Sequence, residues 1–416
     1  PFTGTEEEAI EQLDRLLREA ISLRMISDVP LGAFLSGGVD SSVVVALMQA
    51  QSAKPVKTFT IGFHEEDYNE AIHAAEVARH LGTDHTELYV TPAEAMAVIP
   101  QLPDMYDEPF GDSSQIPTYL VSQLARRHVT VSLSGDGGDE LFAGYNRYFW
   151  GRQLWRQVSW LPQSVRRGMA KGIRSISPEL LNETSRKLRV LVPVMPSFGD
   201  KLHKLAEILA MKDPEAMYLG LVSIWKDPGR IVIGSQEPRT SLTDRSRWAN
   251  VGNFTLQMMA LDLVTYLPDD ILTKVDRASM AVSLEARVPL IDHRVVEFAW
   301  RIPLSMKIQK EGEGKWLLRQ VLYRYVPKHL IERPKMGFGV PIGYWLRGPL
   351  RQWAEDLLDE GRLRREGYFH PKPIREKWTE HLSGQRNWQY LLWNVLMFQA
   401  WLTSHDRPTT PAVSHH

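Results

Sequence analysis

The first 150 residues alternate between short apolar, β-prone runs and amphipathic segments with helical spacing. A capping box formed by Thr5 and Glu8 opens a helix that runs to about Met25. The predicted strands are residues 30–35, 56–63, 85–91 and 129–135. The predicted helices between them are residues 40–51, 69–82 and 116–128. Strands that alternate with helices favour an α/β fold, with a parallel sheet and helices on both of its faces.

The pattern changes after about residue 150, where helical spacing dominates and strand-like runs become rare. We therefore predict an α/β core over residues 1–150 and a mostly helical remainder over residues 151–405. Residues 406–416 form a tail that is similar to a tag remnant. The apolar run at 388–401 is too short to span a bilayer, so it predicts a helix that faces the core or a partner.

The composition removes several classes of function. The 416 residues carry 49 Lys+Arg and 50 Asp+Glu, so the net charge gives no argument for a nucleic acid or an anionic membrane as partner. The chain has no cysteine, which excludes disulfides, thiolate metal sites and cysteine nucleophiles. The acidic N-terminal segment is unlike a signal peptide, and we expect a cytoplasmic protein.

The segment "LSGGVDSS" (35–42) joins a predicted strand to a predicted helix through two glycines. Such a turn exposes backbone N–H groups at the start of the helix, which favours an anion such as phosphate. The lysine of a Walker-type loop is absent. Asp40 repels a phosphate unless a cation lies between them, so the segment predicts Mg²⁺ beside a phosphate. The alternative is an ordinary turn in which Asp40 caps the helix.

A second glycine-rich turn, "LSGDGGDELFAGY" (133–145), also follows a predicted strand, and it carries Asp136, Asp139 and Glu140. Because the carboxyl ends of parallel strands meet at one edge of a sheet, we expect the two turns to meet. Asp40 would then share one Mg²⁺ with Asp136 or Asp139. A solvated acidic turn is the alternative interpretation.

The stretch "SGGVDSS" resembles the pyrophosphate loop of the ATP-pyrophosphatase superfamily, whose members cut ATP between the α and β phosphates and adenylate an acceptor. With four further stretches, it resembles the synthetase domain of the glutamine-hydrolysing asparagine synthetases. These stretches are "SGDGGDELFAGY" (134–145), "DRASMAVSLEARVPLIDHR" (276–294), "GKWLLRQVL" (314–322) and "RPKMGFGVPI" (333–342). The resemblance covers residues 5 to about 400 and implies an ATP-pyrophosphatase α/β core followed by a helical second half.

The resemblance implies that the chain amidates aspartate to asparagine with ATP and Mg²⁺, through a β-aspartyl-AMP intermediate, and releases AMP and pyrophosphate. The residues that match the adenine pocket are Leu35, Ile61, Ser134 and Gly135. The residues that match the pyrophosphate cradle are Ser36, Gly37, Gly38, Asp40, Ser41 and Ser42. Asp40 and Asp139 match the residues that serve Mg²⁺–pyrophosphate.

The same resemblance implies catalytic roles for Lys315 and Asp136, besides that of Asp139. Lys315, in a K-x-x-L-R pattern, matches a lysine that stabilises negative charge during adenylation, and a solvated helix lysine is the alternative. Asp136 stands where many asparagine synthetases have a glutamate that takes a proton from ammonia. Aspartate is one methylene shorter than glutamate. This sequence therefore departs from the family pattern in how far the carboxylate of its base extends.

Two further stretches leave two interpretations open. Glu285, Arg287 and Asp292 belong either to a buried ion network that packs the helical half or to the substrate site. The stretch "DEPFGDSS" (107–114) either approaches the amino acid substrate or forms a polar loop.

The glutamine-using members of the family begin with a catalytic cysteine in a domain of its own, and nothing in this chain resembles that domain. We therefore expect ammonia as the nitrogen donor of this chain, and a glutaminase domain or subunit in the full-length protein. We expect ATP and aspartate or a related carboxylate as substrates, and no nucleic acid or membrane as partner. A homodimer stays open.

Competing functions also stay open. Asparagine synthetase-like proteins use the same chemistry on cell-surface sugar acids, peptides or β-lactam precursors. A β-lactam synthetase would carry a tyrosine–glutamate base pair, which the sequence does not place. The basic, Trp-containing stretch 151–175 indicates either an RNA-binding surface or an amphipathic helix with a solvated basic face. A third reading is a non-catalytic subunit. The presence of Asp40, Asp136, Asp139 and Lys315, which match catalytic positions of the family, argues against it.

Overall fold

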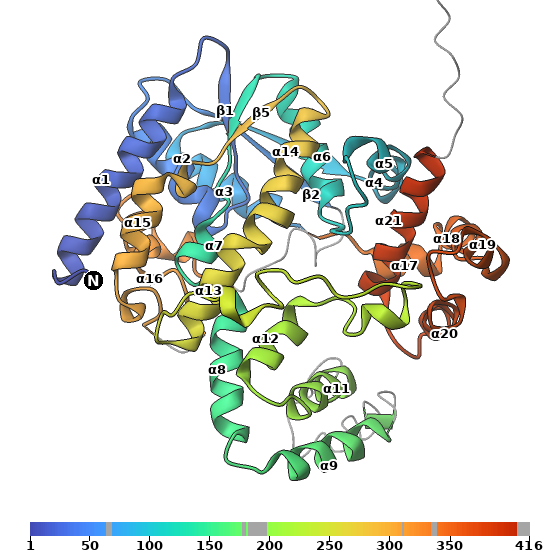
Figure 1. Ribbon diagram of the computed structural model, residues 1–416. Helices are drawn as coiled ribbons and strands as arrows, with labels where there is room; N and C mark the ends of the chain where they lie inside the picture. The colour runs from blue at the N-terminus through green and yellow to red at the C-terminus, as the bar shows by residue number, and fades with distance from the viewer. Residues whose placement is uncertain (64–68, 177–179, 182–197, 310–311, 334–338, 406–416) are drawn as a thin grey trace, which may run out of the picture.

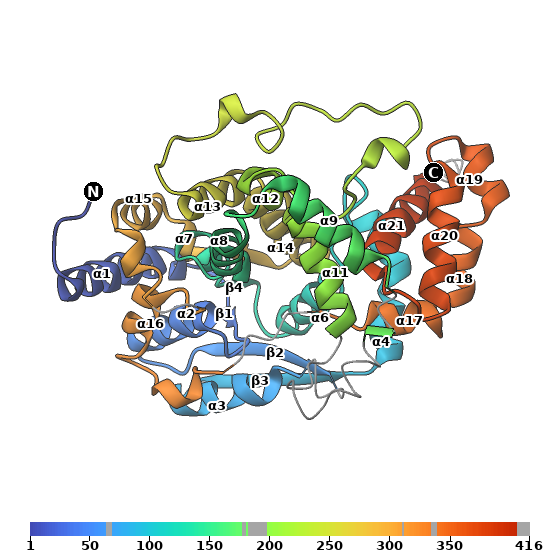
Figure 2. The same cartoon turned by 90° about the horizontal axis from the view of Figure 1, so that it is seen from below.

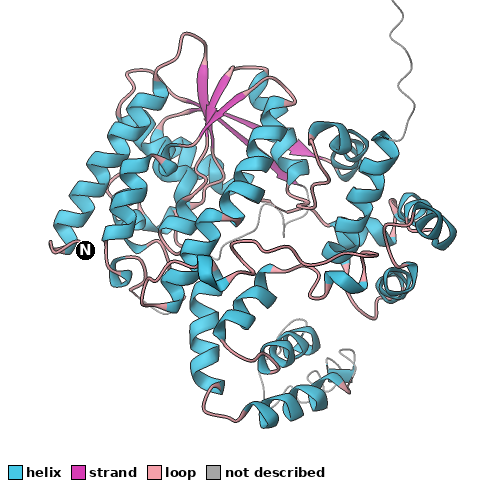
Figure 3. Cartoon of the chain, in the orientation of Figure 1, coloured by secondary structure: helices cyan, strands magenta, loops and turns pink. Residues whose placement is uncertain are grey.

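One parallel sheet lies in the upper part of the view in Figure 1 and has helices on both of its faces (Figure 1, Figure 3). The computed structural model describes residues 1–63, 69–176, 180–181, 198–309, 312–333 and 339–405. In spatial order the strands are β3 (Asp84–Val90), β2 (Lys57–Phe63), β1 (Leu31–Phe34), β4 (Val131–Leu133) and β5 (Glu285–Arg287). All four pairings between them are parallel, which confirms the predicted α/β class.

Four helices of the first part lie where the hydrophobic pattern predicts them: α1 (Glu6–Met25), α2 (Val39–Ala50), α3 (Ala71–Leu81) and α6 (Gln115–Arg126). The short helices α4 (Pro92–Ala97), α5 (Leu102–Met105) and α7 (Gly138–Leu141) were not predicted. The predicted capping box opens α1, where the Glu8 N–H donates to the Thr5 hydroxyl at 3.2 Å and the Thr5 N–H donates to the Glu8 carboxylate at 2.7 Å. A local sequence signal therefore sets where α1 begins.

The later part of the chain is helical, as predicted. Its helices are α8 (Asn146–Val158), α9 (Gln163–Arg174), α11 (Phe198–Leu209), α12 (Pro214–Val222), α13 (Phe254–Val264), α14 (Thr273–Met280), α15 (His293–Arg301), α16 (Trp316–Leu322), α17 (Ile342–Arg347), α18 (Arg351–Leu357), α19 (Glu360–Glu366), α20 (Pro371–Leu382) and α21 (Gln389–His405). In Figure 2 the last five gather at one side of the molecule. Trp393 of α21 is fully buried, which confirms a core helix there. None of the described helices is long and apolar enough to cross a membrane.

Two hydrophobic cores pack on the two faces of the sheet. On one face, α1, α2, α3, α15 and α16 enclose residues such as Leu13 and Val45. On the other face, α6, α14 and the C-terminal helices pack against Phe59 and Ile61 of β2. Phe59 and Ile61 share this face because residues two apart in a strand point the same way. The two cores hold the sheet rigid and leave the carboxyl ends of its strands to carry the loops.

The hydrophobic pattern does not predict β5. This strand has only three residues, two of them charged, so neither its length nor its composition marks it. It forms because β4 offers an open edge, along which Val131 pairs with Glu285 and Leu133 with Arg287. The domain division at residue 150 stays a prediction, and β5 and α14–α16 from beyond that point pack on the same sheet.

The basic and Trp-containing stretch 151–175 forms α8 and α9. Arg166 on α9 is buried, and its guanidinium donates to the carbonyl oxygen of Met211 at 2.9 Å and lies 4.9 Å from the centre of the Trp155 ring. This pair packs inside the helical part. The contact favours the amphipathic-helix reading of the stretch over an RNA-binding one.

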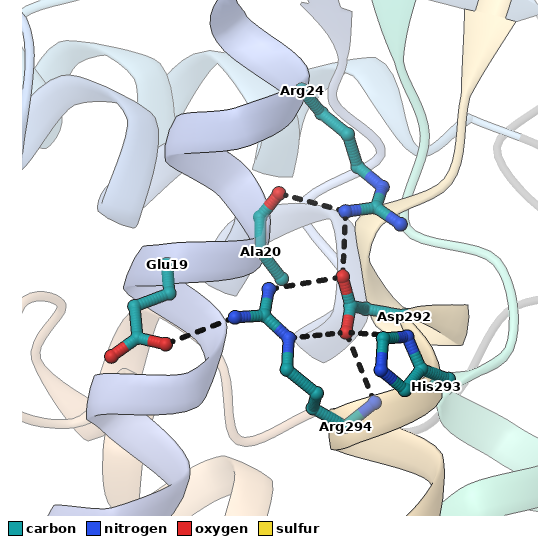
Figure 4. A network of polar contacts seen from close by, with 6 residues as sticks. All are labelled: Glu19, Ala20, Arg24, Asp292, His293 and Arg294. Carbon is teal, nitrogen blue, oxygen red and sulfur yellow. Dashed lines mark hydrogen bonds and ion pairs between the residues drawn. The ribbon is translucent and has the colours of Figure 1, made fainter.

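Asp292 joins the end of α1 to the start of α15 (Figure 4). Its carboxylate is 5% exposed and accepts hydrogen bonds from Arg24 at 2.9 Å and from Arg294 at 2.9 Å. Arg287 extends the group by donating to the carbonyl oxygens of Arg24 and Ile26. Of the two readings of this stretch, the structure favours the ion network for Asp292 and Arg287, whereas Glu285 is exposed and not part of a buried network.

We expect Asp292→Asn to lower the free energy of unfolding by about 2 kcal/mol at neutral pH. Arg24 and Arg294 lose their buried counter-charge, but both are partly exposed and remain partly hydrated, which limits the loss. Hydrogen bonds from Arg294 and then Arg24 lower the pKa of Asp292. This stabilisation is therefore present above the unfolded pKa of about 4 and is lost as the pH falls below it. Urea unfolding at neutral and acid pH measures both effects.

Asp359→Asn is the matched control, because Asp359 caps α19 at an exposed position. Asparagine keeps the cap in both variants. Equal losses of stability in the two variants would contradict a role for the ion network.

Candidate active site

The loop that follows β1 folds back on its own hydroxyl groups. The Ser36 N–H donates to the Ser41 hydroxyl oxygen at 3.1 Å, and the Gly38 N–H donates to the Ser36 hydroxyl oxygen at 3.3 Å. Gly37 has a φ of 72°, and a Cβ there would lie 2.9 Å from the backbone of α3. Glycine is required at this close approach. The result is a compact turn that leads directly into the first turn of α2.

The turn that follows β4 packs against this loop. A Cβ on Gly135 would lie 2.6 Å from the backbone nitrogen of Ser41, and a Cβ on Gly138 would overlap the carboxylate of Asp40. These glycines allow the two turns to touch, because any larger side chain would force them apart. The expectation that the two turns meet at the strand ends is confirmed.

The ammonium of Lys315 lies between the two turns. Its Nζ contacts the carboxylate of Asp40 and lies 2.7 Å from Oδ1 of Asp139. Lys315 is 6% exposed, so the reading of a solvated helix lysine is wrong. Burial by itself lowers the pKa of Lys315, but Asp139 and Asp40 raise it well above its ordinary value. The lysine therefore stays charged, and it unites the three residues assigned to charge stabilisation and to Mg²⁺.

Asp40 and Asp139 suit a shared Mg²⁺ in their chemistry. Each is a hard oxygen ligand, and Gly138 and Gly144 bring the backbone close against the two carboxylates. Among the described residues, no group of three or more histidines and acids could hold a metal ion by itself. Mg²⁺ commonly takes one or two carboxylates together with substrate phosphates, so two are sufficient. The Mg²⁺ site stays a prediction.

Asp136 lies in the same turn as Asp139, and its carboxylate accepts a hydrogen bond from the Ser134 hydroxyl. Burial raises the pKa of Asp136, while the bond from Ser134 and the charge of Lys274 lower it. The carboxyl is therefore more basic than an exposed aspartate. That property suits a group that accepts a proton during a reaction.

The residues predicted to bind adenine lie at or next to three neighbouring strands. Leu35 follows β1, Ile61 belongs to β2, and Ser134 follows β4. The Leu35 N–H donates to Phe59 and the Ser134 N–H donates to Arg287, so both backbone donors are already used. The side chains of Leu35 and Ile61 are enclosed by the two cores. Their contact with adenine stays a prediction. Ser42, which was assigned to the pyrophosphate cradle, lies in α2 and is fully buried.

A second lysine–carboxylate group lies beside Asp136, and the sequence reasoning missed its lysine. Lys274 on α14 is buried and donates to the Asp112 carboxylate at 2.8 Å. Asp270 lies one turn before Lys274, and one of its carboxylate oxygens is buried with no hydrogen-bond partner among the described residues. Asp112 belongs to the stretch 107–114, whose approach to the substrate was one open reading. The signal in the sequence was the four-residue spacing of Asp270 and Lys274, which places an acid and a lysine side by side on a helix.

Burial, and then the neighbouring Asp112, raise the pKa of Asp270 to about 7. The charges of Asp112 and Asp270 raise the pKa of Lys274, although its burial lowers it. The group therefore holds one firmly charged lysine and one carboxyl that titrates near neutral pH. Such a group can bind a molecule that carries both charges.

A tyrosine–glutamate pair is also present, formed by Tyr145 and Glu140. The Tyr145 hydroxyl donates to the Glu140 carboxylate at 2.6 Å, and the guanidinium of Arg147 lies 4.0 Å from the centre of the tyrosine ring. Glu140 is 1% exposed.

The asparagine synthase family model matches residues 12–403. The chain belongs to the asparagine synthase family. It is 30% identical over 409 residues to asparagine synthetase (glutamine-hydrolyzing) 1 of Bacillus subtilis, and the match covers 96% of this chain and 60% of that protein. It is 24% identical over 445 residues to asparagine synthetase (glutamine-hydrolyzing) of Homo sapiens, covering 100% of this chain and 59% of that protein. The chain thus spans about 60% of the length of these relatives.

Gly144→Ala tests whether the contact of Lys315 with Asp139 needs the close backbone approach. The added Cβ would overlap both side chains, so we expect ATP-dependent turnover to fall about a hundredfold as the charges separate. Gly168→Ala on α9 is the control, because its Cβ meets nothing within 4 Å and alanine favours a helix. Turnover of Gly144→Ala equal to that of the control would contradict the assignment.

Proposed function

We propose that this chain is the synthetase part of an asparagine synthetase. It uses ATP to adenylate the side-chain carboxylate of aspartate and then replaces AMP with ammonia, so that asparagine, AMP and pyrophosphate are formed. The observation that carries the proposal is the contact of Lys315 with Asp40 and Asp139 at the glycine loop. Membership of the asparagine synthase family supports it.

In the first step a carboxylate oxygen of aspartate attacks the α-phosphorus of ATP. The bond from that phosphorus to the oxygen bridging to the β-phosphate breaks, and pyrophosphate leaves with the electron pair. The loop N–H groups bind the departing phosphates, and Lys315 stabilises the negative charge that develops. Mg²⁺ held by Asp40 and Asp139 would supply a divalent charge beside the phosphate oxygens.

In the second step ammonia attacks the acyl carbon of the β-aspartyl-AMP intermediate. The carbon–nitrogen bond forms, AMP leaves with the electron pair of the acyl oxygen bond, and the nitrogen gives up a proton. Asp136 accepts that proton, for which its raised pKa is suited. The turn that carries Asp139 thus serves both steps, through two neighbouring acids.

The group of Asp112, Lys274 and Asp270 supports an α-amino acid as the acceptor. Lys274 can bind an α-carboxylate, and the buried, unpaired oxygen of Asp270 can bind an α-ammonium. Lys274 lies close enough to Asp136 and to Asp270 to interact electrostatically with both. A sugar acid has no ammonium to offer, so this group favours aspartate over that alternative.

One assay tests the proposal. The chain is incubated with ATP, Mg²⁺ and ammonium, and with aspartate, glutamate, succinate or a uronic acid. We expect only aspartate to support release of AMP and pyrophosphate. The rate should rise with pH as NH₃ replaces NH₄⁺. Glutamine should not replace ammonium, because this chain has no cysteine to form a thioester. Absence of aspartate-dependent pyrophosphate release, or equal rates with succinate, would contradict the proposal.

Asp270→Asn should raise the KM for aspartate about tenfold to a hundredfold and leave the KM for ATP unchanged, because a charged hydrogen bond to the substrate ammonium is lost. In the unmodified chain that KM should fall as the pH rises through about 7, where Asp270 becomes charged. The variant should lose this pH dependence. Aspartate-dependent exchange of pyrophosphate into ATP measures both effects without a nitrogen donor.

Asp269→Asn is the control, because Asp269 precedes Asp270 in the chain and is exposed. If both variants changed the KM for aspartate equally, or if the KM for ATP moved in parallel, the role of Asp270 would be wrong.

A further inference from the structure

Arg333 lies at the edge of the glycine loop, in the stretch "RPKMGFGVPI", and the mechanism above gives it no role. Its Nη2 donates to the carbonyl oxygen of Ser36 at 3.3 Å. Its Nη1 is buried and has no hydrogen-bond partner among the residues that the structure describes. A buried donor without a partner costs free energy, so this arm of the guanidinium is suited to an acceptor that arrives with a ligand.

The charges around the loop indicate that this acceptor is an anion. Lys315 is matched by two carboxylates, Asp40 and Asp139, so that group contributes no surplus positive charge. Burial lowers the pKa of Arg333, and the opposing effects of Glu70 and Glu76 do not offset it. Glu70 and Glu76 act on Arg333 through charge alone and form no hydrogen bond with it, so Nη1 stays available to an anionic acceptor.

The position of Arg333 relative to the loop agrees with this reading. Gly37 packs against the backbone of His73 and Ala74 in α3, and Arg333 reaches Ser36 just before it. The guanidinium therefore borders the part of the loop that precedes α2. A guanidinium presents several N–H groups in one plane, so it can hold the loop carbonyl with one arm and a phosphate oxygen with the other.

We propose that Arg333 is a phosphate-binding residue of this loop, which contacts the β- and γ-phosphates of ATP and holds the pyrophosphate after cleavage. The inference rests on the proposed function only in that the loop binds ATP. Arg333 would then distinguish a nucleoside triphosphate from AMP, because AMP lacks the groups that it binds.

Calorimetric titration of the full chain with inorganic pyrophosphate and with AMP, each in Mg²⁺, tests the inference. Arg333→Met removes the charge and every N–H donor. Arg333→Lys keeps the charge but loses the planar guanidinium that can bind two acceptors at once. Arg324→Met is the control, because Arg324 bonds to Glu7 at 2.7 Å and not to the loop. We expect the affinity for pyrophosphate to fall at least about tenfold in Arg333→Met, less in Arg333→Lys, and not in the control. The affinity for AMP should stay unchanged in all three.

Unchanged affinity for pyrophosphate in Arg333→Met would overturn the inference. So would an equal loss of affinity for AMP, because Arg333 would then only support the loop. If a thermal melt shows that Arg333→Met does not fold, Arg333→Lys decides: weaker binding of pyrophosphate supports the inference, and unchanged binding overturns it.

The same titration separates this inference from the proposed function. If the unmodified chain did not bind pyrophosphate, the assignment of the loop would be overturned, and Arg333 with it. If it bound pyrophosphate but did not cleave ATP with aspartate, only the proposed acceptor would be overturned, and the variants would still decide the role of Arg333.

Discussion

The ammonium of Lys315 joins three segments that lie far apart in the sequence: the loop after β1, the turn after β4 and the start of α16. A buried charge is stable only when opposite charges surround it, so each segment requires the other two. The backbone strengthens this arrangement, since the Lys315 N–H donates to the carbonyl oxygen of Phe142 at 2.8 Å. Lys315 itself has a φ of 61°, a strained conformation that these contacts maintain.

Two lysine–carboxylate groups flank the turn after β4, and they differ in a way that suits two steps of one reaction. Lys315 is charged and lies at the glycine loop, where negative charge would develop on phosphate. Lys274 is paired with Asp112 and leaves Asp270 to titrate near neutral pH. Asp139 faces the first group and Asp136 the second. One short turn therefore links the two groups that we propose as the phosphate site and the amino acid site.

The helical half does more than cover the sheet. It supplies Lys315 and Lys274, and through β5 it supplies the carbonyl oxygen of Arg287 that accepts the Ser134 N–H at 2.8 Å. The side chain of Arg287 then bonds to backbone carbonyls at the end of α1. These contacts tie the turn to the outer helices, so a change in the packing of the helical half would reach the site.

The sequence by itself determined the elements whose signals are local. Helical periodicity and the Thr5 cap located α1, the glycine turns located the two loops, and the quoted stretches marked Asp40, Asp139 and Lys315 as a set. Tertiary structure alone decided how these residues meet. Strand β5 forms only because β4 offers an edge. The pKa values of Lys274 and Asp270 are shifted by burial and by Asp112, which lies more than 150 residues away in the chain. Burial and long-range pairing depend on the whole fold, and no local pattern records them.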